Sequence, residues 1–198
     1  MLRKIFLSLV FYILVAFGIS LTIKASIGVS SFNALNVAIS EWLRIEVGTI
    51  TGFLNLLFLI IAFLIDPKKD WNEYGLMVLS LILLGNTINF FVYILFPYFG
   101  FETYLSNILI FIIGTCIAGI STGRILYYGI LNFPIEKCCQ LLELVTHRSF
   151  SLYRYSFDII FVTSSILISL IAHLPFFVRE GTLLSLLILS YVIGKARS

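Results

Sequence analysis

The sequence predicts an all-α membrane protein in which six transmembrane helices form two inverted-topology repeats of three, each with a short non-spanning amphipathic helix. Three observations lead to this fold class. The composition is too apolar for a soluble domain. Six apolar stretches have the length, or nearly the length, that a membrane-spanning helix needs. The order of elements in the first half of the chain returns in the second half.

Of the 198 residues, 60% are hydrophobic and 12% are charged, and the mean hydropathy is +1.08. Soluble globular domains carry about 25% charged residues. We therefore expect one integral membrane domain over residues 1–198, with repeat 1 at about 1–100 and repeat 2 at about 101–198. Lys and Arg do not cluster with stacking aromatics, which argues against nucleic-acid binding. The three cysteines fit neither a disulfide framework nor a metal site, so we expect no cofactor and no metal.

The first element is the apolar run Ile5–Ile23, which resembles a signal peptide because two basic residues precede it. Its 19 residues exceed the 7–15 of a signal-peptide core, so we expect a retained spanning helix. A helix needs about 20 apolar residues to cross the ~30 Å hydrocarbon layer. The further predicted spans are 49–65, 75–96, 105–123, 151–173 and 181–194.

Two segments are predicted to be short helices that do not cross the membrane. Ser31–Arg44 has 14 residues, about 21 Å at 1.5 Å per residue, and Phe133–His147 has a similar length. In each segment, apolar and polar residues fall on different helical faces. The polar residues are Asn33, Asn36, Ser40 and Arg44 in the first segment, and Glu136, Gln140, Glu143 and His147 in the second. The second polar face indicates either a cytoplasmic entrance or the solvated side of an interfacial helix.

The placement of basic residues favours six spans with both termini in the cytoplasm, following the positive-inside rule. The ten on the cytoplasmic side would be Arg3, Lys4, Lys68, Lys69, Arg124, Lys137, Arg148, Arg154, Lys195 and Arg197, against Lys24, Arg44 and Arg179 outside. The loop Pro97–Tyr104 would then be external. We expect the protein in the inner (cytoplasmic) membrane of the cell.

An internal repeat supports the same topology. Gly-Ile-Ser at 18–20 precedes Gly28, and the same tripeptide at 119–121 precedes Gly129 at the same separation. From there an offset of 103 pairs Asn33 with Glu136, Asn55 with Asp158 and Phe58 with Phe161. Because each half has an odd number of spans, the second half enters the membrane from the opposite side. Many secondary transporters are built from such inverted repeats.

At these positions the chain resembles a known family. "GVSSFNAL" at 28–35 is similar to the family pattern G-(L/V)-(G/S)-S-P-W-D-x-L, and "EVGTITGFLNLLF" at 46–58 and "REGTLLSLLILSYVIG" at 179–194 are similar to its later helices. The second half matches more loosely, through Pro134, Glu136, Arg154 and Asp158. The chain resembles the YczE/YyaS/YitT-like family of small bacterial integral membrane proteins. The resemblance implies a fold rather than an activity. The family pattern has an acidic residue and a Pro where this chain has Asn33 and Ser31. We therefore do not expect this position to couple a proton or cation here.

The candidate substrate-binding residues are polar side chains in or beside the predicted helices: Asn33, Asn36, Asn55, Glu136, Gln140, Arg154 and Asp158. Arg154 and Asp158 share a helix face and form either an anion or proton site or a structural ion pair. The amides either contact substrate or bridge neighbouring helices.

These residues predict a multi-pass membrane transporter of a small or lipid-linked solute. The alternative is a non-transporting accessory protein that binds or stabilises another membrane component. HExxH, GxSxG and Cys/His/Asn constellations are absent from the sequence, so we do not expect an enzyme. The expected partners are membrane lipid and a small solute, with a homo-oligomer or a membrane protein as a further possibility.

Overall fold

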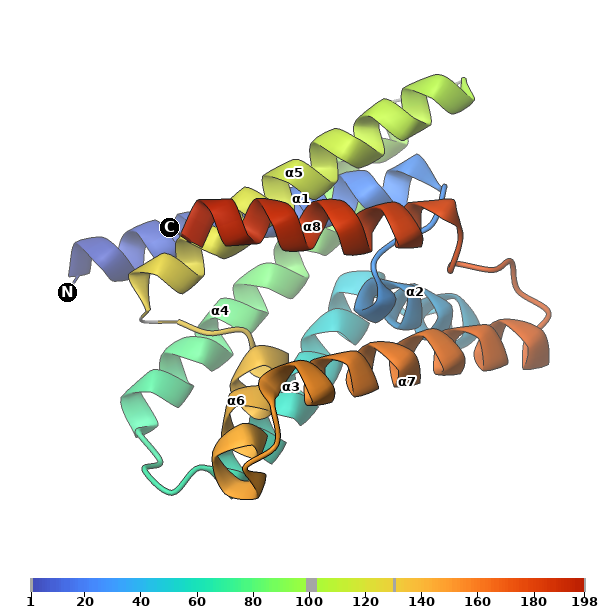
Figure 1. Ribbon diagram of the computed structural model, residues 1–198. Coiled ribbons are helices and arrows are strands. Elements are labelled where there is room, and N and C mark those ends of the chain that lie inside the picture. Colours follow the sequence, from blue (N-terminus) through green and yellow to red (C-terminus); the bar gives the residue numbers. More distant parts are fainter. Residues whose placement is uncertain (1, 99–102, 130, 198) are drawn as a thin grey trace.

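The computed structural model describes residues 2–98, 103–129 and 131–197, which form an all-helical protein with eight α-helices (Figure 1). The helices are α1 (Leu2–Ala25), α2 (Ser31–Leu43), α3 (Val47–Ile65), α4 (Trp71–Asn89), α5 (Tyr104–Tyr128), α6 (Pro134–Thr146), α7 (Phe150–Ile171) and α8 (Glu180–Arg197). A π-helix, Phe90–Leu95, and a 3-10 turn, Phe96–Tyr98, extend α4. The middle of the predicted loop Pro97–Tyr104, residues 99–102, lies outside the described residues.

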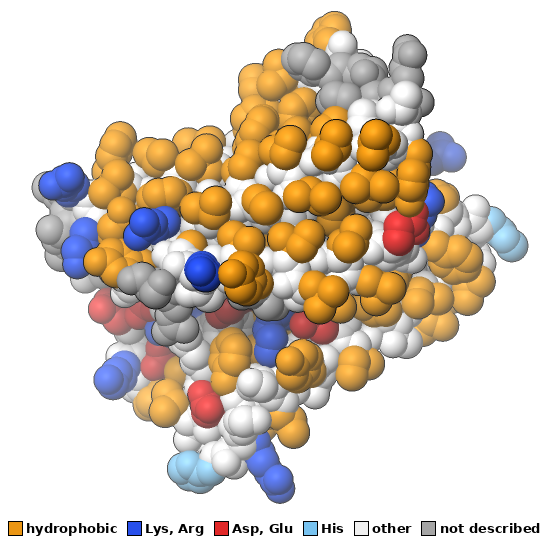
Figure 2. All heavy atoms as spheres, turned by 45° about the horizontal axis from the view of Figure 1, so that its top comes forward, with side chains coloured by type: hydrophobic (Ala, Val, Ile, Leu, Met, Phe, Trp, Pro, Cys, Tyr) orange, Lys and Arg blue, Asp and Glu red, His pale blue; other side chains and the backbone are white. Residues whose placement is uncertain are grey.

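Five helices are long and apolar enough to cross a membrane: α1, α3, α4 with its extension, α5 and α7. The helix α8 has 18 residues with charged residues near both ends, and it is not among the five. Large apolar side chains point outward from these helices, as lipid contact requires. Figure 2 shows hydrophobic side chains covering the middle of one face, with basic side chains gathered toward one end of it.

Two predicted boundaries differ from the structure by four or five residues, each because of a local capping group. The helix α4 begins at Trp71 rather than at 75, since the Asp70 carboxylate accepts the N–H groups of Asn72 and Glu73. The helix α5 continues to Tyr128 rather than ending at 123. It stops where Gly129 takes a left-handed conformation with φ of 64°.

The two short segments predicted from the sequence are the helices α2 and α6, each of 13 residues. Both end at a residue in the left-handed region, Arg44 after α2 and His147 after α6. The helix α2 packs against α7 and α3, while α6 packs against α3 and α7. Both short helices are therefore held between the same two longer helices.

Glycines allow the long helices to approach closely. A Cβ on Gly18 of α1 would lie 2.6 Å from the carbonyl oxygen of Gly114 on α5. Gly119 and Gly123 of α5 meet α8, where a Cβ on Gly123 would lie 2.5 Å from the Cβ of Ala196. The sequence pattern Gly119-x-x-x-Gly123 is thus a close helix contact, as is usual in membrane proteins.

The connection between α1 and α2 is held by the connection between α7 and α8. The N–H of Gly181 donates to the carbonyl of Ile27 at 2.9 Å, and the N–H of Val29 donates to the carbonyl of Phe177 at 3.3 Å. The hydroxyl of Thr182 donates to the carbonyl of Val29 at 2.7 Å. These bonds satisfy the backbone where α1 stops and before α2 begins.

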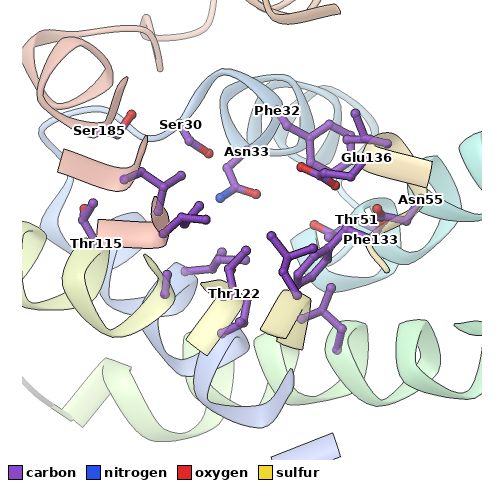
Figure 3. A pocket seen from close by; sticks show the side chains of 18 of the residues that line it. Ser30, Phe32, Asn33, Thr51, Asn55, Thr115, Thr122, Phe133, Glu136 and Ser185 are labelled. Carbon is purple, nitrogen blue, oxygen red and sulfur yellow. The ribbon is translucent and has the colours of Figure 1, made fainter. Parts of the chain in front are cut away.

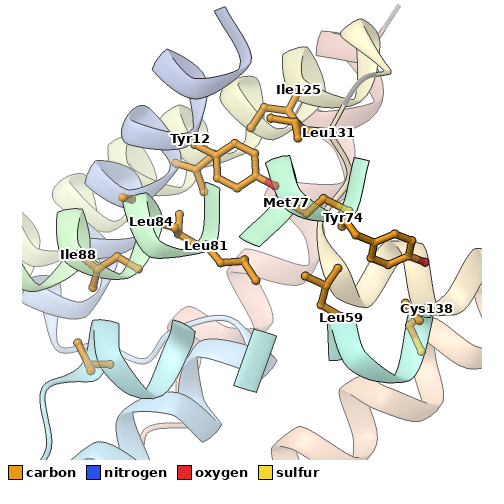
Figure 4. Close-up of a cluster of buried hydrophobic side chains, with 14 of the residues drawn as sticks. Tyr12, Leu59, Tyr74, Met77, Leu81, Leu84, Ile88, Ile125, Leu131 and Cys138 are labelled. Carbon is orange, nitrogen blue, oxygen red and sulfur yellow. The ribbon is translucent and has the colours of Figure 1, made fainter. Parts of the chain in front are cut away.

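The main apolar core lies where α1, α3, α4, α5 and α6 meet (Figure 4). Tyr12 and Met77 are fully buried there, and Cys138 of α6 packs beside them. Cys139 packs in a second cluster with Leu35 and Phe161. The two adjacent cysteines are thus small core residues in this fold. Through them, α6 packs into both apolar clusters.

Candidate functional site: a polar cavity between the two short helices

A cavity of about 430 Å³ opens between α2, α6 and the long helices around them (Figure 3). Small-molecule sites commonly measure about 300–1,000 Å³. Its polar lining comes from both halves of the chain and consists of Thr22, Ser30, Asn33, Thr51, Asn55, Thr115, Thr122, Asn132, Glu136, Gln140, Arg154 and Ser185. The rest of the lining is apolar, so this chamber of mixed character is the feature of the fold best suited to bind a solute.

Five of the seven residues predicted from the sequence line this cavity: Asn33, Asn55, Glu136, Gln140 and Arg154. Asn36 and Asp158 do not line it. The side-chain N–H of Asn36 donates to the hydroxyl of Thr51 at 3.0 Å, which joins α2 to α3. Asn36 is therefore a helix-bridging amide, the second of the two roles considered for it.

Asp158 lies behind Arg154 in a three-helix polar network. The Nη1 of Arg154 donates to the Oδ1 of Asp158 at 2.7 Å, and the hydroxyl of Ser31 donates to the same oxygen. The Nε of Arg154 lies 3.8 Å from the Oε1 of Glu136, close enough for attraction but too far for a hydrogen bond. The network links α2, α6 and α7 at the wall of the cavity.

The carboxyl of Glu136 is the most perturbed acid on the short helices. Burial is the largest effect and raises its pKa above the usual value, and the charge of Asp158 acts in the same direction. The charge of Arg154 opposes both. The side chain keeps 24% of its surface exposed because it faces the cavity. The neutral, protonated form of Glu136 is therefore more favoured than that of an exposed glutamate.

Both short helices direct their N-terminal ends at the cavity. Ser30 and Phe133, the residues that precede α2 and α6, line the cavity, and neither provides a side-chain cap. The first-turn N–H groups of a helix lack partners within the helix, and they carry partial positive charge. Figure 3 shows Ser30 and Asn33 on one side of the cavity and Phe133 and Glu136 on another.

Thr115 of α5 adds a polar atom that sequence reasoning missed. Its side chain is 3% exposed and lines the cavity, and its hydroxyl has no partner among the described residues. By contrast, Thr22 and Thr51 donate to carbonyls of their own helices. Because hydroxyls in helices commonly bond their own backbone in this way, a Thr in a helix gives no sequence signal of a binding role.

Residues 2–198 match the model of a "Family of unknown function (DUF6198)". The chain belongs to this family. It is 28% identical over 138 residues to the "Uncharacterized membrane protein YczE" of Bacillus subtilis, covering 69% of this chain and 60% of that protein. It is 24% identical over 137 residues to the "Uncharacterized protein YyaS" of the same organism, covering 69% of this chain and 67% of that protein. The resemblance read from the sequence is therefore confirmed. No solved structure matches the chain.

The chain of this DUF6198 member spans less than two thirds of YczE. The printed description of YczE as a membrane protein agrees with the five apolar helices of the fold. The descriptions of the family and of both relatives carry no substrate. The cavity is therefore the feature from which a function can be inferred.

The predicted polar face of α6 divides into two parts. Glu136 and Gln140 line the cavity, whereas Glu143 and His147 are exposed at the far end of the helix. The Oε1 of Glu143 accepts the N–H of Phe150 at 3.1 Å, which fixes the start of α7. This face is therefore divided between the cavity and an exposed surface.

An ion cluster on another side of α6 was not predicted. The Nζ of Lys137 lies 2.7 Å from Glu73 of α4 and 3.9 Å from Asp66. Burial tends to raise the pKa of Asp66, but hydrogen bonds from the Lys68 N–H and the Tyr74 hydroxyl, together with the charge of Lys137, lower it overall. Asp66 is thus held as an anion, and α6 is tied to the α3–α4 connection.

Proposed function

We propose that this protein is a multi-pass membrane carrier that binds a small solute, free or lipid-linked, in the cavity between α2 and α6. The observation that carries the proposal is a cavity of about 430 Å³ to which both halves of the chain contribute polar side chains among apolar ones. A merely structural polar network would leave no such space, because buried polar groups normally pack against their partners. The volume suits a small metabolite or the head group of a lipid-linked one.

The carrier is proposed to consist of two inverted repeats, α1–α4 and α5–α8. In support, α2 and α6 have equal lengths, and their left-handed end residues Arg44 and His147 are 103 positions apart. The same offset relates the starts of α3 and α7, at Val47 and Phe150. Under this exchange the packing of α2 on α7 becomes that of α6 on α3. Inverted-repeat carriers place their substrate sites where the two repeats meet.

We further propose six spans with both termini in the cytoplasm. The helix α8, at 18 residues, would reach about 27 Å and would be the sixth span, with its charged ends at the two surfaces. In Figure 1 the N- and C-terminal ends and the connection 66–70 lie toward the left, whereas the connection 172–179 lies toward the right. The positive-inside rule then assigns the left end to the cytoplasm.

Movement of α6 would open and close the cavity in this carrier. Its first turn contacts Arg154 of α7 through Glu136, and Lys137 contacts Glu73 of α4. The two ion pairs hold α6 from different sides. Release of one of them by solute binding would let α6 shift relative to α3, the kind of two-state element that alternating access needs.

The test is a ligand screen on purified protein by thermal stability, followed by uptake into proteoliposomes for each solute that stabilises it. We expect at least one small solute to raise the midpoint temperature of unfolding of the wild type. The same solute should have no such effect on Asn33→Leu, which replaces a cavity amide by an apolar side chain of the same branched shape. Glu41→Gln, at an exposed position on α2, is the matched control and should respond like the wild type.

If no solute stabilises the wild type, or if Asn33→Leu responds equally, the carrier proposal fails. The accessory-protein alternative would then be favoured, and stable co-purification with a membrane partner would be its positive sign.

A further inference from the structure

We infer, on the basis of the proposed function, that the cavity binds a small carboxylate anion together with one proton, which is held by Glu136. The proton comes from the aqueous phase and binds the side-chain carboxylate. Glu136 thereby becomes neutral and gains an O–H donor. The inference adds the charge of the solute and the pH dependence of its binding to the proposed carrier.

The cavity wall offers several groups that bind anions. The first turns of α2 and α6 both meet it, and each helix end is equivalent to about half a positive charge, although in α6 Pro134 has no N–H and the N–H of Glu136 bonds its own carboxyl. Arg154 lines the cavity with a guanidinium of which Nη1 is engaged by Asp158. The buried hydroxyl of Thr115, which has no partner among the described residues, faces the same space and is a donor by itself. Two helix ends, a guanidinium and a free hydroxyl are a suitable set for a carboxylate.

The local charges explain why a proton is needed. Arg154 is flanked by two carboxylates, Asp158 at 2.7 Å and Glu136 at 3.8 Å. Asp158 makes the hydrogen bond, so it compensates most of the guanidinium charge. An ionised Glu136 would then repel an anion entering the cavity, and this repulsion is poorly screened away from water. Protonation of Glu136 removes the repulsion: the formal charge of Arg154, Asp158 and Glu136 together rises from −1 (+1 − 1 − 1) to zero (+1 − 1 + 0), so the helix ends and hydrogen-bond donors can hold the anion.

Few titratable groups face Glu136 from the elements around it. Arg154 and Asp158 face it from α7, Tyr12 from α1 and Cys139 from its own helix. Lys137 is turned toward Glu73 and Asp66. The described cavity-lining residues of α2, α3, α4, α5 and α8 are uncharged: Phe32, Asn33, Thr51, Asn55, Leu84, Phe111, Thr115, Ala118, Thr122, Leu126, Ser185, Leu189 and Ile193. Arg154 is therefore the cation that stabilises the ionised form, and burial works against it.

The test compares binding of charge-matched probes to the purified protein between pH 6 and pH 8, by calorimetry. The probes are benzoate, benzamide and benzylamine, with lactate and lactamide as a smaller pair, and the solutes that the stability screen identifies. We expect the carboxylates to bind, with affinity falling about tenfold per pH unit above the pKa of Glu136, since one proton enters with each anion. Calorimetry in two buffers of different ionisation enthalpy counts that proton directly.

Glu136→Gln mimics the protonated form, so it should bind the carboxylates with little dependence on pH. Glu136→Asp keeps a titrating carboxyl and should retain a pH dependence if Gln at this position impairs folding. Glu41→Gln, exposed on α2, should behave like the wild type. Infrared spectroscopy should show a protonated-carboxyl band that grows when lactate is added to the wild type and that is absent in Glu136→Gln.

Each other outcome is decisive. If the amides or benzylamine bind in preference to the carboxylates, or if carboxylate binding is independent of pH in the wild type, the inference fails while the carrier stands. An infrared spectrum in which Glu136 stays ionised in the carboxylate-bound protein also overturns it. If no solute of any charge binds, the proposed function itself fails.

Discussion

Replacing Gly48 with Ala tests the close crossing of α3 and α4. A Cβ at this position would lie 2.0 Å from the carbonyl oxygen of Gly85, whereas ordinary contacts begin at 3.4 Å, so the helices must separate locally by about 1.4 Å. Such overpacking typically costs about 1–3 kcal/mol. The same shift would weaken the 2.6 Å hydrogen bond from the Gly48 N–H to the Oδ1 of Asn89, worth about 1 kcal/mol. We expect a total loss of roughly 2–4 kcal/mol from these two effects.

Gly52, one turn further along α3, provides the matched control because nothing lies within 4 Å of its added Cβ. Both substitutions gain about 1 kcal/mol of helix propensity, so their difference isolates the crossing. The assay is the free energy of unfolding in detergent micelles, measured by denaturant titration for wild type, Gly48→Ala and Gly52→Ala. Gly52→Ala should match or exceed the wild type. If Gly48→Ala is as stable as Gly52→Ala, α3 and α4 do not cross as described.

Three further results are expected. Arg154→Gln and Asp158→Asn should each lower the free energy of unfolding, and the double mutant should recover part of the loss. The expected coupling energy is about 1–3 kcal/mol, less than for a fully buried pair because both side chains are partly exposed. Additive losses would disprove the pair. Lys137→Met should lower the free energy of unfolding by about 1–2 kcal/mol, because Glu73 and Asp66 are left without their cation. Lys69→Met, on the exposed connection, should change it by less than about 0.5 kcal/mol. In a cysteine-free background, an impermeant thiol reagent applied to cells should label Tyr98→Cys and leave Lys69→Cys unlabelled, and labelling at both positions would contradict the proposed six spans.

Periodicity and length were sufficient to predict the two short helices. In Ser31–Arg44 and Phe133–His147 the polar residues recur at helical spacing, and neither segment could reach across a bilayer. The side chains that this pattern placed together at the N-terminal ends, Asn33 and Glu136, do line one cavity. Local pattern was informative here because each side chain is positioned by its own helix.

Contacts between distant segments were not predictable in this way. Lys137 meets Glu73 across 64 positions of sequence, and nothing in either segment signals the partner. Asn36 was indistinguishable from Asn33 by residue type, yet it bonds to Thr51 while Asn33 faces the cavity. The sequence does contain a signal for the start of α4, since Asp70 followed by Glu73 is a helix-capping pattern. A prediction from hydropathy misses it because these residues are charged.

The hydrogen bonds between the α1–α2 and α7–α8 connections impose an order on biosynthesis. During translation, Ile27 and Val29 leave the ribosome about 150 residues before Gly181 and Thr182, the residues that satisfy their carbonyls. Until then, unwound backbone beside the membrane interior lacks its final partners, which is costly in lipid. We therefore expect the N-terminal half to complete the connection before α2 only when α8 arrives. The two halves are consequently expected to mature as one unit rather than as separately stable fragments.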